Sequence, residues 1–332
     1  MSHETGQAQT ANTKSIITGA MAMSLILSTT TAAVAGTPDE AAIKTAVESV
    51  ATLADSRNFE SLEKLYAGRV RVDYTSAFGG EVEVKTPQAL MTAWAGLLPG
   101  FDRARHAISN VQVKVDGSMA AASAEVTADH WIAGRHWQVT GSYDYSFTNI
   151  GGEWRITAMT FHLKNEAGTR EVLGHAANAA NSRPVSYLER QRTQQAVRDF
   201  LTSLEEQDMS KFASVWAEDA VQDMPYSPEG FPKRVEGKAN LVKHYAAWPE
   251  NSGKANFTKE LVFYPSQDPH TVFVEYRGVC EIKPTGRVYD QRYGGLFRVE
   301  NGKIKLFREY YNPAAFAYAF GLNEGGNLHG NK

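Results

Sequence analysis

The sequence predicts an α+β fold that occurs twice in tandem. Each copy is expected to be a curved antiparallel sheet wrapped around N-terminal helices, forming a cone-shaped α+β barrel. Three observations support this: an internal repeat, helical periodicity at the start of each copy, and long alternating strands joined by tight turns. Helices followed by antiparallel strands are typical of α+β domains. The length of 332 residues also fits two domains better than one.

The repeat has an offset of 150 residues at its N-terminal end. Residues 50–74 (VATLADSRNFESLEKLYAGRVRVDY) align without a gap on residues 200–224 (FLTSLEEQDMSKFASVWAEDAVQDM), and Tyr66 meets Trp216. Identity is low, but the apolar positions coincide. Self-similarity at a fixed spacing indicates two copies of one structural unit.

The same offset applies at the end of each copy. Residues 151–161 (GGEWRITAMTF) align on residues 301–311 (NGKIKLFREYY), which places Met159 at the position of Glu309. The copies therefore carry different side chains at this position. We expect two different cavities, or one active cavity and one degenerate cavity.

The chain is expected to have four parts: a signal peptide (1–35), a first domain (38–174), a linker (175–188) and a second domain (189–332). Small and polar residues with a proline, in the stretch HAANAANSRPVS, mark the linker.

The N-terminal segment has the features of an export signal. Lys14 precedes the apolar run IITGAMAMSLIL, and Ala33 and Ala35 fit a small-x-small cleavage rule. Cleavage after Ala35 would export the protein, and a bacterial periplasm is the expected location. The long polar start with Glu4 is unusual for a signal, and a disordered tail is the alternative.

Each copy opens with apolar residues at three- and four-residue spacing, as in an amphipathic helix. The positions are Ile43, Val47, Val50 and Ala54 in the first copy, and Val197, Phe200, Leu201 and Leu204 in the second. Shorter helices are expected around residues 86–97 and 237–248. Alternating strands follow, and the turn sequences VDGS, NIGGEW and VENGK separate them as hairpins.

Composition excludes several classes of function. The net charge of −3 and the lack of a basic cluster argue against a nucleic-acid partner. The single cysteine, Cys280, excludes a disulfide framework and a cysteine-rich zinc site. No phosphate-binding loop, nucleophile elbow or cofactor motif is present, so no cofactor is expected. Apart from the signal, no stretch is long enough to insert into a membrane.

Polar side chains of the first copy converge, by pattern, on one pocket. His130 shares a strand face with Val126 and Ile132, and Asp55 extends the apolar stripe of the first helix. Tyr74 and His106 are expected to point inward as well. A carboxylate that orients one imidazole, with a second imidazole opposite, can transfer protons near neutral pH. A histidine on an apolar strand is otherwise usually a satisfied core residue. No His-x-His or HExxH spacing predicts a metal.

Glu309 in the second copy lies between aromatic residues on the expected inward face of the last strand. Phe307, Glu309 and Tyr311 alternate on that face. Burial would raise the pKa of this carboxyl group by disfavouring its charged form. Such a group can give and take a proton. The alternative is a buried ion pair with an arginine, which would lower the pKa.

Several stretches of the sequence resemble the nuclear transport factor 2-like superfamily, which includes ketosteroid isomerase and the SnoaL-like polyketide cyclases. The second copy resembles the phenazine-biosynthesis A/B proteins through GKANLVKHYAAW, VFYPSQDPHTVFVEYRG and FRVENGKIKLFREYYNP. These stretches cover most of residues 236–313. The first copy resembles scytalone dehydratase, more loosely, through LADSRNFESLEKLY, RVDYTS and ARHAISN. The fold hosts several reactions and also plain binding. The resemblance also implies that the two copies pair sheet to sheet as an intramolecular pseudo-dimer, with a homo-oligomer as a further possibility.

The scytalone dehydratase resemblance implies a catalytic set in the first copy: Asp55, Tyr74, His106 and His130. Two positions depart from that family. Ala54 stands where a second tyrosine would be, and Phe147 stands near the place of a late-strand asparagine in the pocket. The pair that holds the substrate carbonyl through water is incomplete, so the scytalone reaction itself is not expected.

The phenazine A/B resemblance implies Glu309 as the proton-transferring residue, His244 as a pocket histidine and Asp219 as a nearby acidic residue. Asp223 competes with Asp219 for the acidic role because it is the repeat-mate of Asp73. His244 could equally be an exposed helix residue. Trp248 replaces the serine that follows the histidine by one turn, which would reshape the pocket.

The sequence therefore predicts a cofactor-independent lyase or isomerase for a small apolar compound, aromatic or polycyclic. Dehydration, a double-bond shift and retro-aldol release of an aldehyde all use the same acid/base machinery. One alternative is an exported protein that binds a hydrophobic small molecule without catalysis. Another is an interaction module that uses its sheet face.

Overall fold

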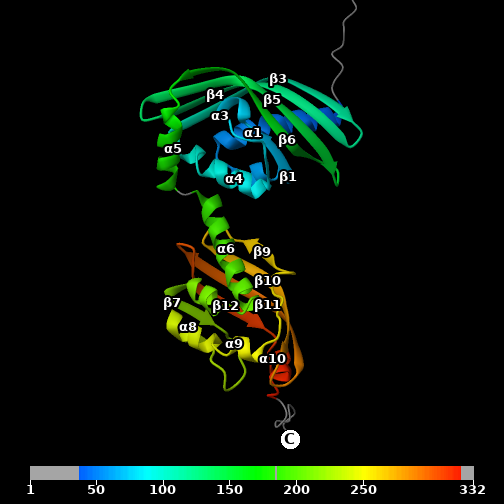
Figure 1. The fold of residues 1–332 in the computed structure, drawn as a ribbon. Coiled ribbons are helices and arrows are strands. Elements are labelled where there is room, and N and C mark those ends of the chain that lie inside the picture. The colour runs from blue at the N-terminus through cyan, green and yellow to red at the C-terminus, as the bar shows by residue number, and fades with distance from the viewer. Residues whose placement is uncertain (1–36, 184, 323–332) are drawn as a thin grey trace, which may run out of the picture. The chain divides into compact units, whose positions relative to one another are not determined.

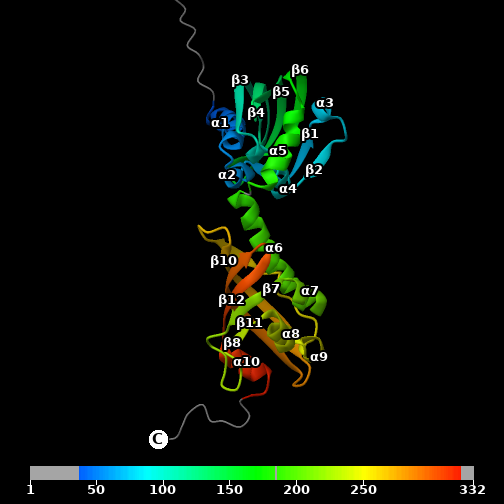
Figure 2. The same cartoon turned by 90° about the vertical axis from the view of Figure 1, so that its left-hand side faces the viewer.

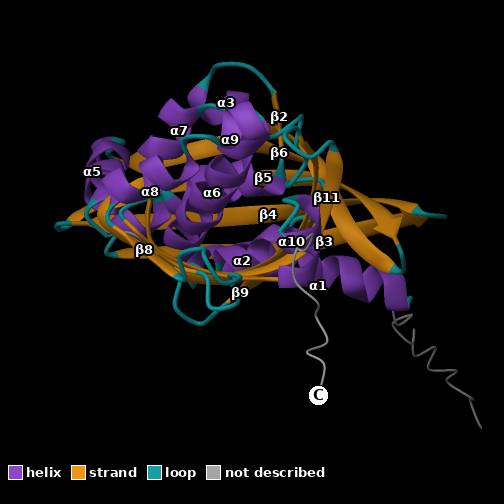
Figure 3. Ribbon diagram, turned by 90° about the horizontal axis from the view of Figure 1, so that it is seen from below, coloured by secondary structure: helices purple, strands orange, loops and turns teal. Residues whose placement is uncertain are grey.

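The structure is a computed structural model that describes residues 37–183 and 185–322. It contains two six-stranded sheets with the same strand order, β2-β1-β6-β5-β4-β3 and β8-β7-β12-β11-β10-β9. In both, helices cover one face of the sheet (Figures 1 and 3). The identical order confirms the tandem α+β fold that the repeat predicts.

Domain 1 consists of the elements from α1 to α5. They are α1 (Pro38–Asp55), α2 (Phe59–Glu63), β1 (Tyr66–Asp73), α3 (Thr75–Phe78), β2 (Glu83–Lys85), α4 (Pro87–Ala95), the 3₁₀ turn η1 (Leu98–Gly100), β3 (Arg103–Asp116), β4 (Met119–Ile132), β5 (Arg135–Ile150), β6 (Glu153–Gly168) and α5 (Glu171–Asn181). The apolar stripe of α1 is buried and packs on β3 and β4. This places the C-terminal end of α1 beside the inner face of the sheet.

Domain 2 consists of the elements from α6 to α10. They are α6 (Ser186–Glu205), α7 (Met209–Ser214), β7 (Trp216–Asp223), β8 (Arg234–Glu236), α8 (Lys238–Tyr245), α9 (Trp248–Asn251), β9 (Val262–Pro265), β10 (Thr271–Ile282), β11 (Arg287–Glu300), β12 (Lys303–Tyr311) and α10 (Pro313–Ala319). Helix α6 packs on β10, β11 and β12. The repeat extends to helix capping, because Asn58 and Asp208 cap α2 and α7 in the same way.

The sheets differ from the expected barrels in two respects. The pairs β1–β6 and β7–β12 are parallel, so each sheet is mixed rather than wholly antiparallel. The edge strands of each sheet do not pair with each other within the described residues, so the sheets curve over their helices without closing. A parallel pair needs a long crossover. Here the whole β2–β5 segment of domain 1 separates β1 from β6.

The register of the last strand corrects one part of the repeat alignment. Tyr66 pairs with Ile156, whereas its mate Trp216 pairs with Ile304, so this strand has an offset of 148 rather than 150 residues. The hairpin of domain 1 is longer by two residues before β6 reaches β1. Glu309 consequently corresponds to Phe161, and the expected match with Met159 is wrong.

Helix α5 packs closely on domain 1. Val172 and Ala176 are buried there, and α5 contacts η1, β4 and β5 (Figure 2). A Cβ atom at Gly100 would lie 1.8 Å from the backbone oxygen of Ala176, so only glycine permits this approach. The predicted linker, 175–188, thus includes the end of α5 and the start of α6. The domain boundaries stay a prediction.

The predicted signal peptide, 1–35, lies outside the described residues. Among the helices that the structure describes, none combines the length and apolar character that crossing a membrane requires.

Candidate active sites

Domain 1 encloses a cavity of about 310 Å³ between its helices and the inner face of its sheet. The walls are almost entirely apolar and aromatic. Polar groups reach the cavity from only a few side chains: Tyr74, His106, His130, Tyr143 and Tyr145. A mostly apolar cavity with a few convergent polar groups is typical of a small-molecule site.

Asp55 ends α1 and contacts His106 at the start of β3 in two ways. Its Oδ1 lies 2.6 Å from Nδ1 of the ring, and its Oδ2 accepts the backbone N–H of His106 at 2.8 Å. Burial raises the pKa of Asp55, but the hydrogen bonds and charge of His106 outweigh burial and hold it below its usual value. This contact fixes the Nδ1 proton and leaves Nε2 of His106 as the basic nitrogen.

His130 lies deeper, on β4, with 6% of its surface exposed. Its ring packs between Phe101 and Trp137, at 4.7 and 5.1 Å between ring centres, and meets His106 edge-on at 5.3 Å. Burial, followed by the charge of His106, lowers the pKa of His130 to about 4. Its Nδ1 has no hydrogen-bond partner in the described part of the chain. His130 is therefore a neutral imidazole at neutral pH.

Tyr74 precedes α3 and lines the same cavity as the two histidines. Its hydroxyl lies 4.0 Å from the sulfur of Met159, and its ring contacts Phe161 and Tyr143. Burial, with a contribution from Tyr143, raises the pKa of Tyr74 well above its usual value. The phenol stays protonated and can act only as a hydrogen-bond donor or acceptor near neutral pH.

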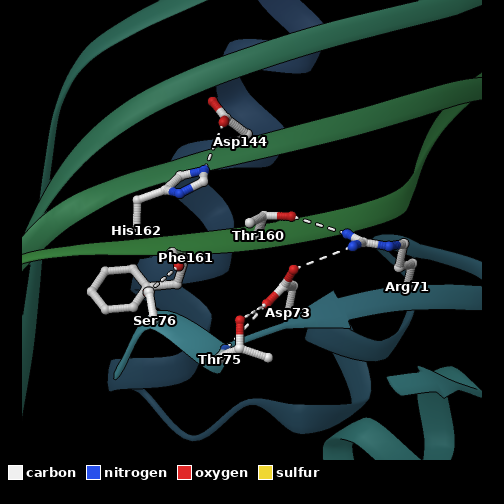
Figure 4. Close-up of polar contacts among 8 residues, drawn as sticks. All are labelled: Arg71, Asp73, Thr75, Ser76, Asp144, Thr160, Phe161 and His162. Atoms are coloured by element: carbon white, nitrogen blue, oxygen red, sulfur yellow. Dashed lines mark hydrogen bonds and ion pairs between the residues drawn. The ribbon is translucent and has the colours of Figure 1, made fainter. Parts of the chain in front are cut away.

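Polar contacts attach α3 to β6 beside this cavity (Figure 4). The hydroxyl of Ser76 donates to the backbone oxygen of Phe161 at 2.5 Å and accepts the N–H of Leu163 at 3.0 Å. Asp73 accepts two hydrogen bonds from Thr75 at the start of α3. These contacts hold the α3 wall of the cavity in place.

Domain 2 has a cavity of about 360 Å³ in the corresponding place. It is also lined mainly by aromatic and apolar side chains. Its lining includes the polar and aromatic side chains of His244, Tyr245, Trp248, Tyr276, Tyr293 and Glu309.

Glu309 projects from β12 into this cavity and has one hydrogen-bond donor. Nε2 of Gln222 lies 3.0 Å from Glu309 Oε2 and 2.8 Å from the hydroxyl of Tyr245. Burial raises the pKa of Glu309 to about 7, against the lowering effect of the Gln222 hydrogen bond. The carboxyl group is therefore divided between its two protonation states near neutral pH.

No arginine in the described residues forms an ion pair with Glu309. Arg277 pairs with Asp290 and Glu260, Arg292 also reaches Glu260, and Arg298 reaches Glu300. All three arginines extend from strand positions that alternate with the inner face. The alternative of a buried ion pair, which would have lowered the pKa of Glu309, is therefore excluded.

His244, Trp248 and Tyr311 line the domain 2 cavity, as expected. His244 is an exposed residue of α8 whose ring meets Tyr245 edge-on at 5.2 Å. Partial burial lowers the pKa of His244. The indole N–H of Trp248 donates to the backbone oxygen of Leu204 at 2.9 Å, which fixes the ring in the wall.

Two acidic residues that were expected near Glu309 do not line the cavity. Asp219 is on the outer side of β7, with its side chain 75% exposed, and pairs with Lys305. Asp223 pairs with Arg234 at 2.8 Å and with Arg308 at 3.2 Å. The pairing of β7 with β12 changes register between Trp216 and Val221. Asp219 lies in this irregular segment.

Two predicted pocket aromatics lie one layer behind the cavity walls. Phe307 is fully buried and stacks on Phe297 at 4.2 Å between ring centres. Phe147 is 2% exposed and packs beside Tyr145. Both are core residues, and neither lines a cavity. Asp55 likewise reaches its cavity only through His106.

Strand pairing shows which residues correspond in the two domains. His130 pairs with Trp137 and Cys280 with Tyr289, so Cys280 takes the place of His130. The same comparison applies to His106, which pairs with Ala128 on β4. In domain 2, Asn256 pairs with Val279 on β10, which places Phe257 opposite the counterpart of Ala128 and therefore in the place of His106. Neither histidine of domain 1 has a polar counterpart in domain 2.

The reverse holds for the polar pair of domain 2. Gln222 corresponds to Val72, and Glu309 corresponds to Phe161. Each domain therefore has its ionisable groups where the other domain has apolar side chains. The two cavities share a scaffold but place their chemistry on different walls.

One carboxylate contact is common to both domains. Glu205, at the end of α6, accepts the backbone N–H groups of Phe257 and Thr258 at 2.5 and 2.7 Å. Asp55, at the end of α1, accepts the N–H of His106 in the same way. This clamp attaches the first helix to the sheet in both domains. Asp55 thus has a structural role besides orienting His106.

Sequence reasoning missed four residues of the domain 2 site: Gln222, Tyr245, Tyr276 and Tyr293. One signal was present, because Gln222 alternates with Ala220 on the buried face of β7. Tyr276 and Tyr293 also occupy inward positions of β10 and β11, and they stack at 4.7 Å. Within residues 37–183 and 185–322, no group of three or more His, Cys, Asp or Glu side chains could hold a metal ion.

Two curated proteins are similar to this chain. YesE, an uncharacterised protein of Bacillus subtilis, is 35% identical over 127 residues, which is 38% of this chain and 86% of YesE. An uncharacterised PhzA/B-like protein of Pseudomonas aeruginosa is 29% identical over 121 residues, which is 36% of this chain and 84% of that protein.

Solved structures with the same fold include two that match single domains. A Bacillus subtilis protein proposed to be an isomerase is 33% identical and covers 42% of this chain and 99% of its own, with a TM-score of 0.39. A Novosphingobium aromaticivorans protein proposed to be a scytalone dehydratase is 18% identical and covers 40% of this chain and 88% of its own, with a TM-score of 0.35.

Two family models also match. SnoaL-like domains are recognised over residues 36–160 and again over residues 197–307. These ranges correspond to the two sheets and their helices. The chain therefore belongs to the SnoaL-like, nuclear transport factor 2-like family, of which it carries two domains in tandem.

Proposed function

We propose that the protein is a cofactor-independent acid/base lyase or isomerase that acts on a small apolar ring compound, aromatic or polycyclic. The observation that carries this proposal is Glu309, a carboxyl group in an aromatic cavity with a pKa of about 7. A group with this pKa can remove a proton from a substrate and return it elsewhere. Relatives proposed to be an isomerase and a dehydratase support the same class of chemistry.

The domain 2 cavity offers the other requirement of such a reaction, which is stabilisation of a developing negative oxygen. Tyr276 and Tyr293 bring phenol groups to the cavity, and burial keeps them protonated by raising their pKa values. A neutral phenol can donate a hydrogen bond to an enolate oxygen. Dehydration, a double-bond shift and retro-aldol release of an aldehyde are all compatible with this arrangement.

Domain 1 is proposed as a second acid/base site with a different mechanism. Nε2 of His106, with Asp55 behind the ring, is a base, and the neutral ring of His130 lies beside it. Tyr74 completes this set at the cavity wall. Removal of a proton by His106 would turn its ring into a cation that Asp55 stabilises.

The charges around both cavities favour an uncharged substrate. No lysine or arginine lines either cavity in the described part of the chain. A carboxylate substrate would meet Glu309 without a balancing cation, and burying an unpaired charge is unfavourable. Aromatic walls instead favour a planar apolar ring.

The test is to identify the molecule that copurifies with the protein by mass spectrometry and to incubate compounds of that class in deuterated water. We expect solvent deuterium to appear at a carbon atom of the recovered compound, with the wild-type protein only. Tight binding with no exchange at any pH between 5 and 9 would contradict an enzyme. It would leave the second candidate, a protein that binds a hydrophobic molecule without catalysis.

One observation favours this second candidate for domain 1. Asp55 makes the same backbone clamp as Glu205, which lies in a domain without the two histidines.

We further propose that the protein works in the periplasm, because residues 1–35 have the pattern of a signal peptide. The mass of the mature chain from a periplasmic extract tests this, and a chain that starts at Gly36 is expected.

A further inference from the structure

The amide of Gln222 connects three elements of the domain 2 site. It projects from β7 and is fully buried, with no exposed surface. Its nitrogen donates to Glu309 on β12 at 3.0 Å and to the hydroxyl of Tyr245 on α8 at 2.8 Å. Both amide protons are therefore used, one by the carboxyl group and one by the phenol.

The other end of this amide is unpartnered. Oε1 of Gln222 is buried and has no hydrogen-bond partner in the described residues. A buried carbonyl oxygen without a donor costs free energy. This orientation of the amide is therefore maintained by its contacts to Glu309 and Tyr245, because the opposite end contributes no hydrogen bond.

We propose that Gln222 is a positioning residue for Glu309, whose amide holds the carboxyl group in one place whether or not that group carries a proton. When Glu309 is ionised, the amide nitrogen donates to it, as observed. When Glu309 is protonated, a half-turn of the amide presents Oε1, which accepts from the acid O–H and from the Tyr245 hydroxyl. The hydroxyl hydrogens reorient, and no other heavy atom has to move. The inference rests on the proposed function only in assigning proton transfer to Glu309.

The other groups that face Glu309 form no hydrogen bond to its carboxyl group within the described residues. They are phenols from four elements: Tyr245 on α8, Tyr276 on β10, Tyr289 and Tyr293 on β11, and Tyr311 on β12. His244 is on the same cavity wall as Tyr245. The nearest arginine in sequence, Arg308, is engaged with Asp223. Within the described residues, Gln222 is the side chain that donates a hydrogen bond to the carboxyl group of Glu309.

Domain 1 provides an internal comparison. Where domain 2 has Glu309 and Gln222, domain 1 has Phe161 and Val72. The amide is absent where the carboxyl group is absent. Domain 2 thus has the inward-facing glutamine together with the acidic residue. Strand β1 of domain 1, which corresponds to β7, forms without a glutamine at this position.

The experiment is a carbon-13 NMR titration of the full chain labelled at glutamate carboxyl carbons, with the Glu309 signal assigned by its loss in Glu309→Gln. We expect Gln222→Met to raise the titration midpoint of Glu309 by about one pH unit, because the hydrogen bond that the amide donates to the carboxylate is charge-assisted and therefore stronger than the one it accepts from the neutral acid. Gln291→Met is the matched control. Gln291 is another buried glutamine of domain 2, bonded to the backbone of Asn312 rather than to Glu309.

If Gln222→Met does not fold, Gln222→Val provides the test, because it removes the same hydrogen bond and introduces the residue type that domain 1 has at the corresponding Val72. A midpoint that moves with neither variant, or that moves equally in Gln291→Met, would overturn the proposal.

The pH–rate profile is a separate readout. We expect turnover at pH 7 to fall about fivefold in Gln222→Met and to recover at pH 9. A loss that is equal at every pH would indicate a merely structural role. An inactive wild-type protein would contradict the proposed function, and the titration would still decide the role of Gln222.

Discussion

The two domains share one scaffold and differ in where they place ionisable groups. Domain 1 has His106 and His130 on β3 and β4, where domain 2 has Phe257 and Cys280. Domain 2 has its carboxyl group on β12, where domain 1 has a phenylalanine. The apolar core keeps the fold constant, so the polar positions are free to differ.

The residues of the cavity wall thus differ between two domains that share one fold, as expected when a fold can carry different sites. Burial acts in opposite directions on the two groups, because it disfavours the charged form of each. It keeps His130 neutral and deprotonated, and it keeps much of Glu309 neutral and protonated. At neutral pH His130 is therefore a weak base that can form hydrogen bonds but does not hold a proton, whereas Glu309 can accept or donate one.

The largest expected effect is a loss of turnover that distinguishes the domain 2 site from the domain 1 site. Glu309→Gln should lower turnover by at least about 100-fold, because removal of a general acid/base typically costs 10² to 10⁴. Ligand affinity should be retained, since glutamine has the same shape. The measurement is kcat with isothermal titration of the ligand. If activity is retained in Glu309→Gln and lost in His130→Ala, domain 1 carries the reaction and our ranking of the sites is wrong.

The second prediction is that stability depends on pH with opposite signs in the two domains. The pKa of Glu309 is about 7 in the folded state and about 4.5 when unperturbed, so its contribution to stability is lost as pH rises from about 4.5 to about 7. The pKa of His130 is about 4 against 6.5, so its contribution is lost as pH falls from about 6.5 to about 4.

Each shift corresponds to at most about 3 kcal/mol, at 1.36 kcal/mol per pH unit. The check is urea unfolding at several pH values, comparing wild type with Glu309→Gln and with His130→Asn. Each difference curve should slope in its own direction. Two parallel curves would show that burial does not govern one of the groups.

A smaller effect is expected from the carboxylate clamp that the domains share. Asp55→Ala and Glu205→Ala should each lower the free energy of unfolding by about 1–3 kcal/mol, because backbone N–H groups lose their acceptor. Asp55→Asn, which keeps a hydrogen-bond acceptor, is the control and should lose less stability. If Asp55→Ala is as stable as wild type, the clamp does not contribute to the free energy of unfolding of domain 1.

The smallest effect concerns Asp219, which the family resemblance implicated and the structure places on the surface. Asp219→Asn should change kcat and ligand affinity by less than twofold. Its stability should stay within about 0.5 kcal/mol of wild type, because exposed ion pairs contribute little. Steady-state kinetics and a urea titration are sufficient. A large loss of turnover would require Asp219 to reach the substrate by a route that the structure does not show.

The tandem α+β organisation and the inward positions of several cavity residues follow from the pattern of amino acids alone. Strand alternation placed His130 and Glu309 inward, because the side-chain period of two holds wherever one sheet face is buried. Helical spacing placed the stripe of α1 on the sheet. Such short-range periodicities are properties of the backbone and can be read without knowing which strands pair.

Which side chains contact each other depends on how the strands and helices pack. The two-residue difference in hairpin length between the domains, which makes Phe161 the counterpart of Glu309, depends on strand register. The Gln222 contact to Glu309 joins residues 87 positions apart, and Asp55 and His106 are 51 apart. Contacts over such distances follow from the packing of whole elements. The family resemblance implies Asp219 as a residue near Glu309, whereas in the structure Asp219 lies where the pairing of β7 with β12 is irregular and its side chain is exposed.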